Sequence, residues 1–360
     1  MEGGDMRTKE NVITRREAIV TASAGVLAAA VPATAAASEE APMTELKDRY
    51  EVIVVGGGPA GLSAALVLGR ACRSVLLCDS GKGRNAPAEG VHGFLGQDGT
   101  PPSELRRVGR EQLRPYDVTM HDGKVVDARK AEGGFDVVLE GGRTVSCRKL
   151  ILATGVTDVL PESPGLRELW GKSVIHCPYC HGWEFRGRRW AFLVPADTVV
   201  ETATLLSGWT TKLTLLTNGP SEVSAEHRAW LEGRAVEIVE GRIERLEGDG
   251  DELKAIHVEG GRRLDRDVLF VHGRLRQASD LAVRLGCSLV DTGPKAGVVK
   301  ADPFGATEVE GLYVAGDASE SGVPSVASAV AEGAVAAAFA CRAIFTEDAR
   351  RPPGGPVRRG

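Results

Sequence analysis

The chain has 360 residues, a formal net charge of −5 and an aromatic content of 5%. This length allows two domains with separate cores, and the composition is typical of an α/β protein rather than a disordered or fibrous one. The acidic balance argues against a nucleic-acid-binding surface. Seven cysteines are too few, and odd in number, for a disulfide scaffold.

The first 42 residues differ from the rest and are predicted to be a twin-arginine signal peptide and linker. Arg15 and Arg16 precede a stretch without charged residues from Ala18 to Ser38, which ends in small residues suited to cleavage. The chain is therefore expected to be exported. The alternative is a start at Met43, which would make the protein cytoplasmic.

A strand, a glycine turn, a helix and a second strand follow in that order. The apolar segment Glu51–Val55 leads into the glycine turn, and the second strand ends at Asp79. This is the dinucleotide fingerprint, in which glycines let the backbone approach a pyrophosphate and the acid accepts from a ribose hydroxyl. The turn residues expected to contact the dinucleotide are Gly56, Gly58, Pro59, Ala60 and Gly61.

Two later segments, Lys149–Gly155 and Thr307–Ser319, resemble the ATG and GD motifs of two-dinucleotide flavoproteins. The resemblance implies FAD as cofactor and assigns the ribityl chain to Asp317. It also implies that the helix capped by Ser325 aims its N-terminus at the flavin. The cofactor contacts carried over from these flavoproteins are Thr154, Gly155, Gly316 and Asp317, with Arg84 and Asn85 at the adenine half.

The segment between the two FAD motifs contains a Cys-x-x-Cys pair, Cys177 and Cys180. That placement resembles low-molecular-weight thioredoxin reductases, and CPYCHG is similar to their dithiol-oxidase-like subgroup. The resemblance implies a homodimer and two Rossmann-like three-layer α/β domains, the second inserted in the first. The predicted domains are 49–165 with 295–346 for FAD, 166–294 for the insert, and 347–360 as a disordered tail.

The insert should hold a nicotinamide site after the strand Arg189–Val194, but the signals are missing. No glycine occurs from Arg188 to Ser207, and the turn carries Pro195 and Asp197 instead. A side chain blocks close approach, proline removes a donor, and the negative charge opposes a pyrophosphate. The next turn, residues 218–227, has no Arg or Lys to pair with a 2′-phosphate. Use of NADPH is therefore doubtful.

The Cys-x-x-Cys pair has three interpretations: half a zinc site, a structural disulfide or a redox centre. Adjacent His176 and Cys177 can hardly both ligate one tetrahedral ion, so no metal is predicted. A two-residue loop also stabilises little as a staple. By resemblance, Cys177 exchanges with substrate and Cys180 faces the flavin. His181 is expected to accept the thiol proton, or else to be a turn residue; His176 has either a supporting or a catalytic role. The other five cysteines are expected to be inert core thiols.

These features predict an FAD-dependent thiol-disulfide oxidoreductase that acts on sulfur groups. The favoured reaction oxidises a small-molecule or protein dithiol, with oxygen as the electron acceptor. One alternative is a thioredoxin-disulfide reductase driven by NADPH or another donor. Another is a flavin-bound redox sensor with little turnover. The identity of the dithiol stays open.

Overall fold

The computed structural model describes residues 45–293, 295–321 and 323–350. The predicted signal peptide, 1–42, lies outside these residues. The predicted C-terminal tail begins too early at 347, because the last helix, α8 (Val326–Ala349), continues past it. Glu347 is held there by Arg148, with 2.9 Å between Oε2 and Nη2, and by Lys149.

The first domain is built on a seven-stranded sheet in the order β3-β2-β1-β6-β5-β4, with β17 also pairing with β6. Parallel pairing joins β1, β2, β3, β6 and β17, while β4 and β5 form an antiparallel hairpin next to β6. The central strands are apolar on both faces, as buried parallel strands require. The strands are β1 (Arg49–Val55), β2 (Val75–Asp79), β3 (Val118–Asp122), β4 (Val125–Ala131), β5 (Gly134–Leu139), β6 (Thr144–Leu152) and β17 (Leu312–Val314).

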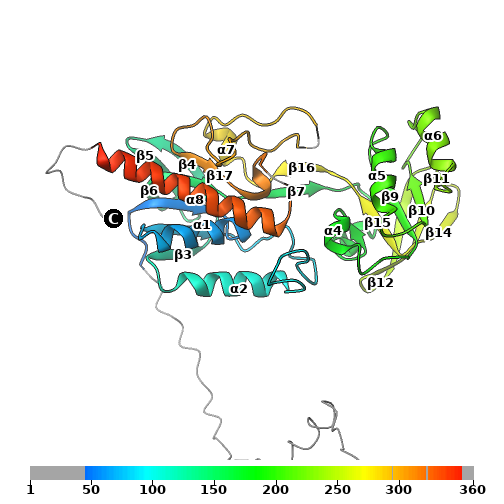
Figure 1. Ribbon diagram of the computed structural model, residues 1–360, viewed down its shortest axis with the longest axis horizontal. Helices are drawn as coiled ribbons and strands as arrows, with labels where there is room; N and C mark the ends of the chain where they lie inside the picture. Colours follow the sequence, from blue (N-terminus) through cyan, green and yellow to red (C-terminus); the bar gives the residue numbers. More distant parts are fainter. Residues whose placement is uncertain (1–44, 294, 322, 351–360) are drawn as a thin grey trace, which may run out of the picture. The chain divides into compact units, whose positions relative to one another are not determined.

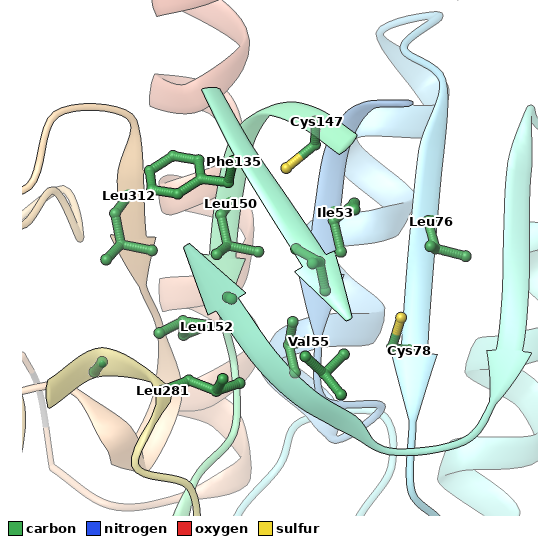
Figure 2. Close-up of a cluster of buried hydrophobic side chains, with 14 of the residues drawn as sticks. Ile53, Val55, Leu76, Cys78, Phe135, Cys147, Leu150, Leu152, Leu281 and Leu312 are labelled. Atoms are coloured by element: carbon green, nitrogen blue, oxygen red, sulfur yellow. The ribbon is translucent and has the colours of Figure 1, made fainter. Parts of the chain in front are cut away.

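Two cores cover the faces of this sheet. On one face α1 (Pro59–Arg70) and α8 pack together, as Figure 1 shows, with α2 (Pro102–Leu113) beside α1. The other face buries Phe135, Leu150 and Leu312 (Figure 2). Among the described residues, α8 alone is long and apolar enough to cross a membrane, but its buried alanines belong to the core shared with α1.

The inserted domain has a parallel five-stranded sheet in the order β11-β10-β9-β15-β8 and an antiparallel sheet β12-β13-β14. Their strands are β8 (Val174–Ile175), β9 (Trp190–Leu193), β10 (Leu213–Leu216), β11 (Glu237–Val239), β12 (Ile243–Asp249), β13 (Glu252–Val258), β14 (Arg262–Asp265) and β15 (Val268–Val271). The helices are α3 (Leu166–Leu169), α4 (Pro178–His181), α5 (Val199–Leu206) and α6 (Ala225–Glu232). The strand predicted at 189–194 is β9.

Two antiparallel strands, β7 (Val156–Val159) and β16 (Arg274–Gln277), connect the domains. The return to the first domain therefore comes earlier than the predicted boundary at 294. The short helix α7 (Leu281–Arg284) already belongs to the first domain, because Leu281 and Cys287 pack in its core, where Figure 2 places Leu281 near Leu152.

Candidate active site

The carboxyl ends of four strands of the first sheet lie in register. Val55 of β1 pairs with Cys78 of β2 and with Leu152 of β6, and Leu152 pairs with Val314 of β17. The glycine turn, Asp79, the ATG-like turn and the GD-like turn each follow one of these strand ends. The three motifs, some 260 residues apart along the chain at their extremes, therefore meet at one edge of the sheet, where open α/β sheets bind ligands.

The glycine turn leaves room for a ligand to approach the protein backbone closely. A β-carbon on Gly56, whose φ is 116°, would lie 2.1 Å from the carbonyl oxygen of Ala153, so the turn depends on glycine there. A β-carbon on Gly58 would meet nothing within 4 Å. Pro59 starts α1, and no side chain caps this helix end. Open space in front of uncapped N–H groups suits a pyrophosphate.

Asp79 is buried at the end of β2, directly below the turn, where a β-carbon on Gly57 would come within 2.2 Å of its carboxylate. Its Oδ1 accepts from the Gly81 N–H at 2.9 Å, and its Oδ2 accepts from Arg106 Nη2 at 2.6 Å. Sequence reasoning missed Arg106, which reaches the carboxylate from α2. The ribose contact assigned to Asp79 stays a prediction.

Arg84 joins two acids that are distant in sequence. Its guanidinium donates to Asp158 at 2.6 and 2.7 Å and to Asp317 at 2.8 Å. Burial works against the charge, but the two carboxylates outweigh it and raise the pKa of Arg84. Arg84 thus pairs with Asp317, the residue assigned to the ribityl chain, and its contact with the adenine half of FAD stays a prediction. Asn85 lies in the same loop, where its carbonyl accepts the Ala88 N–H.

The GD-like turn is fixed by Glu332 of α8, which sequence reasoning missed. Its carboxylate accepts from the Gly316 N–H at 3.0 Å and from the hydroxyls of Ser319 and Ser328. Ser325 caps α8 as predicted, since its hydroxyl accepts the Ser328 N–H at 3.1 Å. Together with the open glycine turn, these contacts provide a cradle that fits FAD.

Gly58→Ala tests this fit. The residue has φ −77° and ψ −178°, which alanine adopts freely, so stability should change by less than about 1 kcal/mol. Affinity for FAD should fall by about tenfold or more, because the new methyl group occupies the space in front of α1. Reconstitution of the apoprotein, followed by flavin fluorescence, gives the dissociation constant. An unchanged constant would place the pyrophosphate elsewhere.

Cys177 and Cys180 form a disulfide with 5.3 Å between their α-carbons. They flank the first turn of α4, and Cys177 Sγ accepts the Cys180 N–H at 3.1 Å. That N–H also stabilises a thiolate on Cys177 after reduction. Within residues 45–293, 295–321 and 323–350 no three His, Cys, Asp or Glu side chains converge as metal ligands. Of the five other cysteines four are buried, but Cys72 is exposed, contrary to the prediction of a core thiol.

The two histidines beside the disulfide differ in their surroundings. Both ring nitrogens of His181 are buried without a hydrogen-bond partner among the described residues. Burial lowers the pKa of His181, and Glu184 opposes that shift. His176 stacks on Trp170, with 5.5 Å between ring centroids. Burial, helped by the charge of Arg84, lowers the pKa of His176 to about 4. Both rings are therefore neutral at pH 7.

The turn between β9 and α5 does not form a phosphate cradle. The Thr198 N–H and hydroxyl both donate to the Pro195 carbonyl, which uses up donors inside the turn. Asp197 is exposed there, and Glu201 lies in the first turn of α5. Arg228, the first basic residue after β10, pairs with Glu240 at 2.5 Å. These residues do not fit the diphosphate or the 2′-phosphate of NADPH.

An FAD-type sheet edge and a Cys-x-x-Cys disulfide in an inserted nucleotide-type domain define a two-dinucleotide flavoprotein. Residues 50–333 match the model of the pyridine nucleotide-disulphide oxidoreductase family. The chain belongs to this family, and within it to the low-molecular-weight thioredoxin reductase-like flavoproteins. It is an FAD-dependent oxidoreductase acting on sulfur groups, which confirms the predicted family, fold class and cofactor.

Similar proteins from other organisms support this placement. Thioredoxin reductase tcpT of Claviceps purpurea is 34% identical over 308 residues, which cover 82% of this chain and 95% of the relative. The crystal structure of an oxidoreductase from Agrobacterium tumefaciens has 39% identity and a TM-score of 0.77, covering 83% of this chain and 99% of that one. A putative thioredoxin reductase TrxB from Bacillus anthracis has 31% identity and a TM-score of 0.78, with 83% and 99% covered.

Proposed function

We propose that the protein oxidises a dithiol to a disulfide through Cys177–Cys180 and passes the electrons to molecular oxygen. The observation that carries this proposal is the turn Pro195–Thr198. Pro195 has no backbone N–H, the Thr198 N–H and hydroxyl bond inside the turn, and the exposed Asp197 is negatively charged, so this turn is poorly suited to the phosphates of a nicotinamide dinucleotide. The disulfide is then the remaining entry.

The disulfide Cys177–Cys180 is reduced by the substrate in two successive thiol–disulfide exchanges. A substrate thiolate attacks Cys177 Sγ, the bond to Cys180 breaks, and Cys180 leaves as a thiolate. The second substrate thiolate attacks the substrate sulfur, which releases Cys177 and closes the substrate disulfide. The Cys180 N–H stabilises Cys177 as the leaving group. FAD bound in the cradle would supply the acceptor for the electron pair of the reduced cysteines, with oxygen as the final oxidant. The sum is dithiol plus oxygen giving disulfide plus hydrogen peroxide.

His181 is suited to hold the protons released in this exchange. Its neutral ring lies directly after Cys180 and has two unpartnered nitrogens. Because the thiols must lose their protons to react, a nearby neutral imidazole speeds the exchange at a pH below the thiol pKa. His181 can no longer accept a proton at a pH below its own pKa, because the ring is then already protonated.

His181→Asn should lower the rate of dithiol oxidation at pH 7 by about 10²-fold. The pKa of His181 is held below its ordinary value of 6.5. The parent protein should therefore oxidise dithiols faster than the variant down to pH 6.5, and this difference in rate should disappear as the pH falls further. The difference between the two rates should also become smaller near pH 9, where the substrate is itself a thiolate. Rates of oxygen uptake from about pH 5 to 9 for both proteins measure this. Superimposable pH–rate profiles of the two proteins would show that His181 is only a turn residue.

Anaerobic titration of the yellow protein, first with NADPH and then with dithiothreitol, tests the proposed direction. Dithiothreitol should bleach the flavin and NADPH should not, and admitted oxygen should restore the colour with release of peroxide. Rapid bleaching by NADPH with little effect of dithiothreitol would overturn the proposal in favour of a reductase, the activity named for tcpT. Bleaching by dithiols without sustained oxygen uptake would instead indicate a redox sensor.

We further propose that the chain is exported through the twin-arginine route. Arg15 and Arg16 and the uncharged stretch after them support this, and export would take the enzyme away from NADPH but not from oxygen. Replacing both arginines with lysine should retain the protein in the cytoplasm, as fractionation would measure. A full-length protein that is cytoplasmic with its arginines intact would contradict it.

The family resemblance alone supports a homodimer. Light scattering of the FAD-loaded protein tests it, and the mass of a single chain would contradict it.

A further inference from the structure

An open depression of about 350 Å³ lies beside the domain connector, at the carboxyl ends of β9 and β15. We call it the connector pocket. Its walls come from the end of β7, from the turn after β9 and from the segment after β15. Its lining residues are Val159, Leu160, Pro161, Leu193, Val194, Pro195, Val271, His272, Gly273 and Arg274. This is the edge of the sheet at which a doubly wound domain binds its ligand.

The lining is apolar except on one side. Val, Leu and Pro side chains form most of it, whereas the segment after β15 contributes His272 and Arg274. Both are exposed, and within the described part of the chain the Arg274 guanidinium has neither an ion pair nor a hydrogen bond. Two exposed acids lie close in sequence to other lining residues, Glu162 next to Pro161 and Asp197 two residues after Pro195. The anionic end of a ligand is thus attracted to the unpaired charge of Arg274.

The pocket does not suit a dinucleotide. A pyrophosphate needs converging backbone donors and no opposing charge, whereas Pro195 lacks an N–H, the Thr198 N–H bonds to the Pro195 carbonyl, and Asp197 is negatively charged. The volume is at the lower end of the range for small-molecule sites. Apolar walls with one cationic side instead match a compact molecule that has an apolar body and a single negative group.

We propose that the connector pocket binds a small amphiphilic anion, an apolar ring or chain carrying one carboxylate or sulfonate. The apolar body lies against Val159, Leu193 and Val271, and the anionic group pairs with Arg274 and faces His272. Such a ligand contacts both connector strands and the inserted sheet at once, because Val159 ends β7 and Arg274 begins β16. The site goes beyond the proposed function, since it makes no use of the disulfide or the electron acceptor.

Two fluorescent probes of similar shape test the site on the FAD-loaded protein. 1-Anilinonaphthalene-8-sulfonate carries the anion, and N-phenyl-1-naphthylamine lacks it. Both should bind with one-site saturation. Arg274→Gln should weaken the sulfonate by about tenfold, the loss of one charged pair, and leave the uncharged probe unchanged. Arg276→Gln is the matched control: this arginine also lies exposed on β16, without a partner in the described residues, but it does not line the pocket.

Val194→Trp, which fills the pocket, should abolish binding of both probes while the flavin content stays that of the parent. Equal effects of Arg274→Gln and Arg276→Gln would overturn the proposal. So would sulfonate binding that survives Val194→Trp, because the probe would then lie elsewhere, for instance on the exposed Trp183. Displacement of the probe by equimolar NADPH would also overturn it and return the pocket to a nucleotide.

Discussion

Cys180→Ser and Cys177→Ser should each lower dithiol oxidation by at least about 10³-fold, with FAD still bound. Either change leaves one sulfur of the pair, which can form a mixed disulfide with substrate but cannot carry two electrons onward. Oxygen uptake with dithiothreitol measures the loss, and flavin absorbance measures retention of the cofactor. The cofactor should stay, because the cradle lies in the first domain and the pair in the insert.

Cys72→Ser provides the matched control, since Cys72 is the exposed free cysteine of the described residues. Its turnover should equal that of the parent. Turnover in Cys180→Ser within about a factor of ten of the parent would show that dithiols reduce the flavin without the disulfide, and the proposed exchange would be wrong. The remaining thiol of Cys180→Ser should react once with 5,5′-dithiobis(2-nitrobenzoate) in addition to Cys72.

Gly333→Ala should cost about 2–4 kcal/mol of the free energy of unfolding and release FAD. Gly333 lies where α8 crosses α1, and a β-carbon there would come within 2.0 Å of the Ala60 carbonyl oxygen and 2.8 Å of its carbon. The helices must separate, which moves the N-terminal turn of α1 away from the cofactor. Denaturant unfolding and flavin release measure the two effects.

Gly109→Ala in α2 is the comparison. Its β-carbon would approach only the Cδ1 of Leu62, at 3.0 Å, and that side chain can turn aside. Alanine also favours a helix interior by about 1 kcal/mol over glycine, so stability should be unchanged within about 1 kcal/mol. If Gly333→Ala behaved like this control, the close crossing of α1 and α8 would not constrain the cradle.

The sequence predicted the parts of the site that depend on local pattern. Strand, turn and helix around Gly56 are where expected, because apolar periodicity and glycine spacing specify them over a few residues. The expectation that the turn after β9 binds phosphate poorly rests on the residue types at 195 and 197, and it stays a prediction. Ser325 was recognised as a cap from its position before an apolar helix.

Contacts across long separations could not be predicted. Arg84 meets Asp317 across 233 residues, and Glu332 meets the Gly316 N–H only because α8 folds back over the sheet. Such pairs depend on which loops come together after folding. The local sequence around a charged loop residue does not indicate which residue it will pair with. The return at β16 was placed too late for the same reason, since Leu281 shows its domain only by what it packs against.

Because the two connector strands are paired, the insert is attached to the first domain at one place only. Val159 and Arg274 are direct partners in β7 and β16, so the points where the chain leaves and re-enters the first domain lie about 5 Å apart. A two-residue turn could join them into a hairpin and leave the seven-stranded sheet uninterrupted. The flavin-type domain could therefore lose, exchange or acquire its redox module as one piece of DNA, and the trimmed first domain is a candidate for a minimal flavin-binding scaffold.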